Sequence, residues 1–256
     1  MSHNSTILIT GATSGIGYGL AQTYAKAGHD LVLTARTHFQ LEHMAEQFAN
    51  DYNIQVFIIP DDLSDPDAPQ RIYAMTKMHN IHVDILINNA GFGLQGKFSQ
   101  TNLTTELNMI QVNISALTEL TKLFLEDMIR EGQGHIVNIA STAAFQPGPY
   151  MAVYYATKSY VLHFSEALRE ELKKTGVSVT TICPGPTKTN FENTANMEFS
   201  KNFNIMHVDE AVNLTFHAIQ QKKHIAILGN KNKWLAFSTR FAPYYLLTKI
   251  VARLQK

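Results

Sequence analysis

The fold of this chain is indicated most clearly by one stretch near its start, Thr6-Ile7-Leu8-Ile9-Thr10-Gly11-Ala12-Thr13-Ser14-Gly15-Ile16-Gly17. Its first five residues are predicted to form a strand, because they are mostly apolar on both faces. Glycines then lead into apolar residues at helical spacing, namely Ile16, Leu20 and Tyr24. Such a turn lets the backbone approach a pyrophosphate, and the helix N-terminus supplies aligned N–H groups. The stretch therefore predicts a phosphate-binding strand–turn–helix unit. Because its spacing is G-x-x-x-G-x-G rather than G-x-G-x-x-G, a turn that only needs unusual backbone angles stays as the alternative.

The same alternation of short apolar runs with helical patterns continues along the chain. The further runs are Leu31–Ala35, Gln55–Pro60, Val83–Asn88, His135–Ala140, Val177–Cys183 and Ile225–Gly229. Among the helices, one is expected to open with Asp65 as N-cap and Pro66 in its first turn, and another to run unbroken over Leu107–Phe124. Strands that alternate with helices predict right-handed βαβ units. We expect a single-domain Rossmann fold, in which helices flank a doubly wound, seven-stranded parallel sheet.

We divide the chain into a catalytic domain over residues 1–233 and a helical extension over 234–256. Within the domain, residues 190–208 carry a weak pattern and are long for a connection, which predicts a lid over the substrate. The extension is expected to form a helix pair broken at Pro243. We favour its packing on the body or on a second subunit. A helix lying in a membrane interface is the less favoured alternative, suggested because only Lys249 and Arg253 interrupt its apolar run.

Composition excludes several classes of function. The 256 residues hold 21 Lys+Arg and 21 Asp+Glu, so a basic surface for nucleic acid is not expected. Cys183 is the only cysteine, which excludes an intrachain disulfide and a cysteine-based zinc site, and the histidines form no metal-binding motif. Five residues precede Thr6 and no apolar run reaches 18 residues, so a cytoplasmic location is expected.

Polar residues follow several strands, at the sheet edge where open α/β sheets bind ligands. Asp61-Asp62-Leu63 follows the third strand, and Asn88-Asn89-Ala90-Gly91 follows the fourth. The second strand ends in Ala35-Arg36, where an acidic residue would bind a ribose 2′-hydroxyl and exclude a 2′-phosphate. Because Ala35 has no carboxylate and Arg36 suits a phosphate, the sequence favours NADP over NAD. An Arg36 that is merely a solvated surface cation is the alternative.

A tyrosine and a lysine four residues apart, Tyr154 and Lys158, share one helix face. A nearby ammonium favours the phenolate, so we expect the pKa of Tyr154 to be lowered toward neutrality, as a general acid–base requires. Ser141 ends the fifth strand at the same sheet edge, and Asn113 is a polar residue in the middle of a predicted helix. Taken singly, each of these residues is equally compatible with a turn, a cap or a satisfied interior hydrogen bond.

Taken together, Thr10–Gly17, Asn88–Gly91, Asn113, Ser141, Tyr154/Lys158 and Pro184-Gly185 occur in the order and spacing of one family. From Thr6 to about Gly229, the chain resembles the short-chain dehydrogenase/reductase family, in its NADP-preferring form. The resemblance implies a catalytic set of Asn113, Ser141, Tyr154 and Lys158. Ser141 would orient the substrate oxygen, Tyr154 would transfer the proton, Lys158 would lower its pKa, and Asn113 would hold a water that links Lys158 to solvent.

The resemblance also implies an NADP(H) site. Its expected residues are Gly11, Ser14, Gly15, Ile16 and Gly17 at the pyrophosphate and nearby ribose, Arg36 at the 2′-phosphate, Asp62 and Leu63 at the adenine, Asn89, Ala90 and Gly91 along the adenosine, Tyr154 and Lys158 at the nicotinamide ribose, and Pro184, Gly185, Thr187 and Thr189 at the nicotinamide. The expected reaction interconverts an alcohol and a ketone or aldehyde, with reduction as the favoured direction. A homodimer or homotetramer, paired through helices over 104–128 and 154–174, is a further implication.

The substrate is expected to be apolar, because large apolar residues fall in loops near the predicted pocket. They are Phe92, Leu94, Phe145, Tyr150, Phe191, Met197 and Phe199. A non-catalytic NADP(H) sensor of the same fold is the main alternative function, although a sensor would not need Tyr154 and Lys158 together. A sugar epimerase is a weaker alternative, since those enzymes carry a larger carboxyl-terminal substrate domain.

Overall fold

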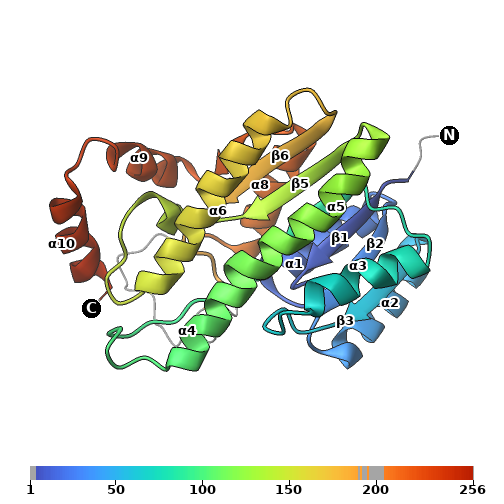
Figure 1. Ribbon diagram of the computed structural model, residues 1–256, viewed down its shortest axis with the longest axis horizontal. Helices are drawn as coiled ribbons and strands as arrows, with labels where there is room; N and C mark the ends of the chain where they lie inside the picture. Colours follow the sequence, from blue (N-terminus) through green and yellow to red (C-terminus); the bar gives the residue numbers. More distant parts are fainter. Residues whose placement is uncertain (1–3, 190, 192–194, 196–204, 256) are drawn as a thin grey trace.

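The computed structural model describes residues 4–189, 191, 195 and 205–255. A seven-stranded parallel sheet in the order β3-β2-β1-β4-β5-β6-β7 forms its centre, which confirms the predicted fold (Figure 1). The strands are β1 (Thr6–Thr10), β2 (Asp30–Ala35), β3 (Val56–Pro60), β4 (Ile85–Asn88), β5 (Gly134–Ile139), β6 (Val177–Cys183) and β7 (Ile225–Ile227). The chain order reverses between β1 and β4, and this switch point is where doubly wound sheets bind ligands.

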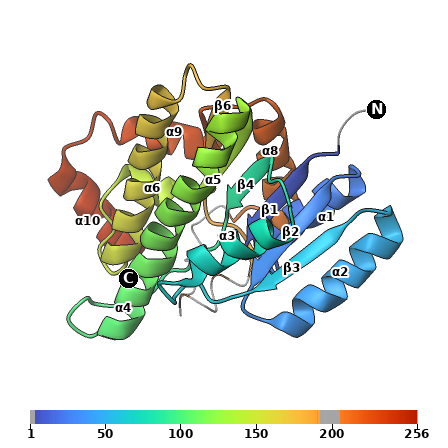
Figure 2. The same cartoon turned by 45° about the vertical axis from the view of Figure 1, so that its right-hand side comes forward.

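Helices cover both faces of the sheet, and each face has its own hydrophobic core (Figures 1 and 2). One core is built by α1 (Gly15–Lys26), α2 (His38–Tyr52) and α8 (Val208–Gln220). The other is built mainly by α3 (Ala68–Met78) and α5 (Leu117–Glu131), with α6 (Ala152–Glu171) beside them. The inner strands are buried on both faces, which explains why their sequences lack alternation, whereas the edge strands β3 and β7 are largely half-buried.

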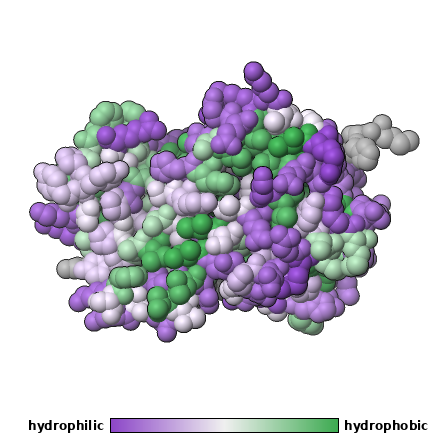
Figure 3. All heavy atoms as spheres, viewed as in Figure 1, coloured by the Kyte–Doolittle hydropathy of each residue, from purple (hydrophilic) through white to green (hydrophobic). Residues whose placement is uncertain are grey.

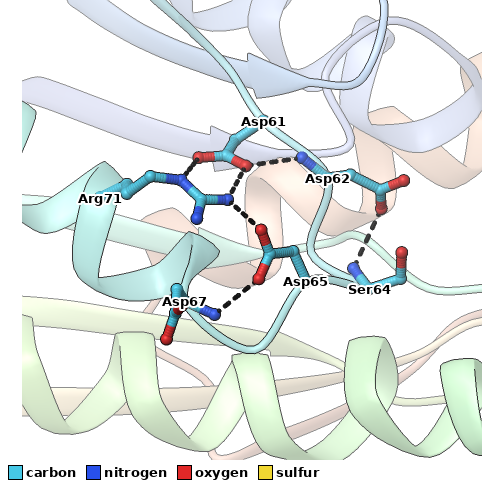
Figure 4. Close-up of polar contacts among 6 residues, drawn as sticks. All are labelled: Asp61, Asp62, Ser64, Asp65, Asp67 and Arg71. Carbon is cyan, nitrogen blue, oxygen red and sulfur yellow. Dashed lines mark hydrogen bonds and ion pairs between the residues drawn. The ribbon is translucent and has the colours of Figure 1, made fainter.

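Two predicted helices differ from the structure. The third helix begins at Ala68, with Asp67 as N-cap, so the predicted start at Asp65 and Pro66 is wrong. The Asp65 carboxylate instead accepts hydrogen bonds from Arg71 at 2.8 Å and from the backbone N–H of Asp67 at 3.0 Å, which stabilises a turn before the helix (Figure 4).

The predicted continuous helix over Leu107–Phe124 is also wrong. It consists of α4 (Leu103–Ile110), a π-helical segment η1 (Gln111–Ala116) and α5. A π-helical turn inserts an extra residue per turn, and such turns are frequent at functional sites. Asn113 lies within this segment and is 1% exposed. The wider turn therefore accounts for a polar residue that was unexplained in a helix interior.

Beyond β7 the chain forms α9 (Asn230–Ser238) and α10 (Tyr244–Leu254), with Pro243 as the N-cap of α10. The predicted boundary between residues 233 and 234 thus falls inside α9. α10 packs on the body through Leu247 and Val251. Just after it, the Gln255 side chain donates to the Tyr155 hydroxyl at 2.9 Å, and the Gln255 carbonyl accepts from the Gln95 side chain at 2.8 Å. No helix in the described part of the chain combines the length and apolar character needed to cross a bilayer.

Candidate active site

The described site residues gather at the carboxyl ends of the strands. Each of the first six strands is followed by predicted site residues, namely Gly11–Gly17 after β1, Arg36 after β2, Asp62 and Leu63 after β3, Asn89–Gly91 after β4, Ser141 after β5 and Pro184–Thr189 after β6. Tyr154 and Lys158 lie in α6. Because all the strands are parallel, these ends form one edge of the sheet. The predicted residues from distant parts of the sequence are thereby brought together.

The glycine positions of this turn, Gly11, Gly15 and Gly17, do not readily accept a side chain. Gly11 and Gly15 have φ angles of +65° and +55°, in the left-handed region that favours glycine. A Cβ added at Gly17 would lie 2.4 Å from the Gly11 carbonyl oxygen and 2.4 Å from the Asn89 Nδ2. The Ser14 side chain makes no capping hydrogen bond to α1 among the described residues. The turn thus presents bare backbone and a hydroxyl at a helix N-terminus, which fits a dinucleotide pyrophosphate.

Thr10 and Asn89 hold this turn in place. The Thr10 hydroxyl accepts hydrogen bonds from the backbone N–H groups of Asn89 at 3.0 Å and Ala90 at 2.9 Å. The Asn89 side chain donates to the carbonyls of Thr10 at 2.9 Å and Gly11 at 3.2 Å. Asn89 was predicted to line the adenosine, whereas its amide nitrogen braces the glycine turn. Thr10 was not among the predicted site residues, although a threonine that ends a buried strand next to the turn could have pointed to it.

The loops after β2 and β3 lie side by side. The Ala12 N–H donates to the Thr34 carbonyl at 3.2 Å, and the Asp61 N–H donates to the Ala35 carbonyl at 3.1 Å. These two bonds hold the end of β2 between the glycine turn and the loop after β3. Arg36 comes directly after this strand end and is exposed. At the loop after β3, Arg71 pairs with Asp61 and Asp65 (Figure 4). This pairing fixes the segment of Asp62 and Leu63. The Leu63 side chain itself is buried in the core.

The segment after β6 contacts both the glycine turn and Ser141. A Cβ at Gly15 would lie 3.3 Å from the Thr189 Cβ, so the predicted nicotinamide and pyrophosphate segments adjoin. The Pro184 carbonyl accepts from the Thr142 N–H at 2.8 Å and from the Ser141 hydroxyl at 3.4 Å. Thr187 forms a parallel bridge with Met206, and Gly185 lies against Asn232 of α9. The segment after β6 is thus held by contacts with the loop after β5, with Met206 and with α9.

Ser141 and Tyr154 form the centre of the site. Burial raises the pKa of Tyr154 to about 12, and the nearby Ser141 hydroxyl, which favours the phenolate, only partly offsets this. The expected lowering of this pKa by Lys158 is therefore wrong for this structure. Lys158 Nζ lies 5.9 Å from the centre of the Tyr154 ring and donates to the Ile139 carbonyl at 2.9 Å, and its ammonium does not offset the effect of burial on the Tyr154 pKa. Tyr154 is a protonated acid throughout the neutral range.

Lys158 is itself perturbed, because it lies almost completely buried. Burial lowers the pKa of Lys158 from 10.5 to about 8. A Cβ at Gly91 would lie 3.3 Å from the Lys158 Nζ and 2.9 Å from the Asn113 Oδ1, so this glycine permits the close approach of the two polar groups.

Asn113 binds the loop after β4. Its Oδ1 accepts from the Phe92 N–H at 3.1 Å, and its Nδ2 donates to the Phe92 carbonyl at 2.9 Å and to the Thr157 hydroxyl at 3.1 Å. Both amide hydrogens are thus used within the protein, and only one lone pair of Oδ1 is left for the predicted water. Asn113 acts here by positioning the loop against α6.

Apolar side chains also contact the Tyr154 ring. The Phe191 ring centre lies 5.3 Å from that of Tyr154, and a Cβ at Gly93 would touch Phe191, Met151 and Tyr154. Met151 was not predicted for the pocket. Phe145, which was, packs beside Trp234 and Phe237 of α9 instead. Met197, Phe199 and most of the predicted lid over 190–208 lie outside the described residues.

Known proteins share these features along most of the chain. A family model described as short chain dehydrogenase matches residues 5–199. An uncharacterized oxidoreductase of Staphylococcus aureus is 33% identical over 220 residues, which cover 86% of this chain and 93% of that protein.

Solved structures agree. A short-chain dehydrogenase from Sphingobium yanoikuyae in complex with NADPH has a TM-score of 0.84 at 32% identity, with 93% of each chain covered. A bulky-bulky ketone specific alcohol dehydrogenase from Comamonas testosteroni has a TM-score of 0.80 at 30% identity, with 93% of this chain and 92% of that chain covered. The chain therefore belongs to the short-chain dehydrogenase family of oxidoreductases.

Proposed function

We propose that the protein reduces a ketone or aldehyde to an alcohol with NADPH, and catalyses the reverse reaction with NADP. The observation that carries this proposal is the placement of a protonated Tyr154 near Ser141 and Lys158, at the same sheet edge as the glycine turn. These are the groups that a carbonyl needs as it accepts a hydride, namely a hydrogen-bond donor and a proton donor.

Tyr154 gives its proton to the substrate oxygen in this mechanism. A pKa of about 12 keeps the phenol protonated, which suits reduction. Ser141 orients the substrate oxygen by donating a hydrogen bond. Lys158, with a pKa of about 8, is mostly an ammonium at pH 7, and it stabilises the phenolate as the proton leaves. The nicotinamide, when bound, supplies or accepts the hydride.

The preference for NADP is assigned to Arg36. Its side chain is exposed beside the glycine turn, and no acidic side chain in the described ranges pairs with it. The relative from Sphingobium yanoikuyae, solved with NADPH, supports this assignment. We expect Arg36→Ala to weaken NADPH binding at least tenfold, because a charge-assisted hydrogen bond is worth roughly 1.5–3 kcal/mol. NADH binding to the same variant serves as the control, since NADH has no 2′-phosphate, and an equal loss for both would contradict the assignment.

The substrate is assigned to the class of bulky apolar carbonyl compounds. Phe191, Met151 and the Tyr154 ring supply an apolar wall next to the proton donor. The 30% identical relative from Comamonas testosteroni is specific for bulky-bulky ketones, which supports the same class here.

The test compares two adjacent tyrosines. Tyr154→Phe is expected to lower NADPH-dependent turnover of a panel of aromatic and alicyclic ketones by more than a thousandfold. The variant should still bind NADPH, which an increase in nicotinamide fluorescence would show. Tyr155→Phe is the matched control, because Tyr155 faces Gln255 rather than Ser141, and it should keep its turnover. An active Tyr154→Phe would falsify the mechanism. A wild-type protein that binds NADPH but reduces none of the panel would favour a non-catalytic sensor.

A homodimer or homotetramer is also proposed, through α4, α5 and α6. Figure 3 shows apolar side chains gathered over α4 and the neighbouring helix α6. On α4, Leu103, Leu107 and Ile110 are exposed. A second copy of the chain that packs on this face would remove them from water.

A further inference from the structure

Since α9 begins at Asn230, the helical extension spans residues 230–255 of the described chain, and it differs in charge from the rest of the protein. It contains the cations Lys231, Lys233, Arg240, Lys249 and Arg253, and the sequence has no Asp or Glu after Glu210. Since the whole chain has a formal net charge of zero, the remainder is acidic. Figures 1 and 2 both place α9 and α10 together at one end of the molecule, away from α2 and β3. This end of the molecule therefore carries a net positive charge, and the rest a net negative one.

Exposed aromatic side chains lie on the same extension. The ring centres of Trp234 and Phe237 are 6.4 Å apart, and those of Phe237 and Phe241 are 5.2 Å apart, so the three rings form a row. Trp234 is 73% exposed and Phe241 is 75% exposed. Tyr244 and Tyr245 continue the exposed aromatic surface at the start of α10.

α10 has two apolar faces, and only one of them is covered. Leu247 and Val251 are buried against the body, whereas Leu246, Ile250 and Leu254, one position before or three positions after them, are exposed. Lys249 and Arg253 lie next to this exposed stripe on the helix, and Lys249 Nζ is 5.9 Å from the centre of the Tyr245 ring. Apolar side chains bordered by long cationic ones are typical of a helix that lies in a membrane interface.

An apolar groove completes the surface. It has a volume of about 430 Å³ between α9 and Phe145, is lined by Ile227, Trp234, Ala236 and Phe237, and has Lys233 and Arg240 in its wall. An apolar floor next to two cations is complementary to an acyl chain with an anionic headgroup.

We propose that the extension binds the surface of an anionic lipid bilayer. Its aromatic rings would enter the interface, where Trp and Tyr are favoured, and its cations would pair with the lipid headgroups. A twofold contact between two extensions is disfavoured, because it would bring like charges together, and the exposed face of α4 already offers a separate apolar surface for a second copy. This inference does not depend on the proposed catalytic function.

The experiment is flotation of the full-length protein with vesicles of phosphatidylcholine alone or with one third phosphatidylglycerol. Binding to the anionic vesicles is expected to exceed binding to the neutral ones by at least tenfold, and to fall severalfold at high salt, because screening weakens charge attraction. The variant Trp234→Ala/Phe241→Ala should lose binding through the rings. The variant Lys249→Glu/Arg253→Glu should lose it through the charges.

Matched substitutions elsewhere are the controls. Phe39→Ala removes a ring that is 76% exposed on α2, and Lys222→Glu/Lys223→Glu reverses two exposed charges just after α8. Both should bind anionic vesicles like the wild type. The proposal is overturned if the wild-type protein stays unbound, or if the control variants lose binding as much as the extension variants do. It is also overturned if the extension variants change the mass measured by light scattering, since the surface would then be a subunit contact.

Discussion

Burial determines the protonation of single side chains in this active site. Tyr154 is held as a neutral acid and Lys158 as a weakened cation, in both cases because the surrounding protein removes water from the charged form. Two glycines of the site are needed because a side chain in their place would clash with polar groups of the protein. At Gly17 and Gly91, polar atoms of other residues occupy the space that a methyl group would need.

The lowered pKa of Lys158 predicts a pH-dependent stability. Between pH 8 and 10.5 the unfolded chain keeps the Lys158 proton while the folded chain has lost it, so the free energy of unfolding rises with pH in this window. Relative to Lys158→Met, the wild type should gain on the order of 3 kcal/mol across it. Urea unfolding at several pH values measures this difference. The control Lys26→Met changes an exposed lysine of α1 and should show no such trend, and a pH-independent difference at Lys158 would contradict the prediction.

Gly17→Ala is predicted to disrupt cofactor binding. Its new methyl group would lie 2.4 Å from the Gly11 carbonyl oxygen, so the backbone of the turn must shift. We expect NADPH affinity to fall more than tenfold and stability by about 1–3 kcal/mol. Gly19→Ala is the matched control in the same helix, since its methyl group would meet only the Val212 side chain. It should lower stability but keep the affinity, as titration of nicotinamide fluorescence would show.

Among the elements, the π-helical segment η1 has the clearest link between local geometry and the site. It aims Asn113 at both polar groups of the Phe92 backbone, and so joins the loop after β4 to α6 through Thr157. The Arg71 pairing with Asp61 and Asp65 does the same for the loop after β3. Each of these two loops is thus tied to a helix.

Asn113→Leu is predicted to loosen the loop after β4. It leaves the Phe92 N–H and carbonyl without their partner, which should cost on the order of 2–4 kcal/mol of stability. Hydrogen exchange at the Phe92 amide should accelerate. Thr157→Val is the control, because it removes one contact of Asn113 and keeps both bonds to Phe92. Unchanged exchange in Asn113→Leu would show that η1 is held by other contacts.

Strand positions could be predicted because buried parallel strands are short, continuous apolar runs in the sequence. The predicted bounds of β1 and β6 are the same as the observed ones. Motif spacing likewise identified the residues at the sheet edge. The start of α3 was mistaken because Asp65 and Asp67 both suit an N-cap, and only the position of Arg71 decides between them. The π-helical turn and the role of Thr10 depend on contacts with residues about 20 and 80 positions away, which no local pattern records.

At the scale of the assembled protein, exposed apolar side chains of the described residues gather on α4 and on the helical extension. We predict that Leu107→Glu, on α4, converts the proposed oligomer into a smaller species, because it places a charge in a face proposed to pack against a second copy. Light scattering after gel filtration measures the mass. Met78→Glu, at a residue 65% exposed on α3, is the control and should leave the mass unchanged. A Leu107→Glu variant with wild-type mass would count against this interface.

The packing of α1 on α8 has a consequence for synthesis on the ribosome. Gly19 lies against Val212, and the rings of Tyr24 and Phe216 are 5.1 Å apart, although about 190 residues separate each pair. At 5–20 residues per second, on the order of 10–40 s pass between the emergence of α1 and that of α8. During this time the nascent chain displays an apolar helix face with no partner. The face of α1 that packs on α8 therefore stays uncovered until nearly the whole chain has been made.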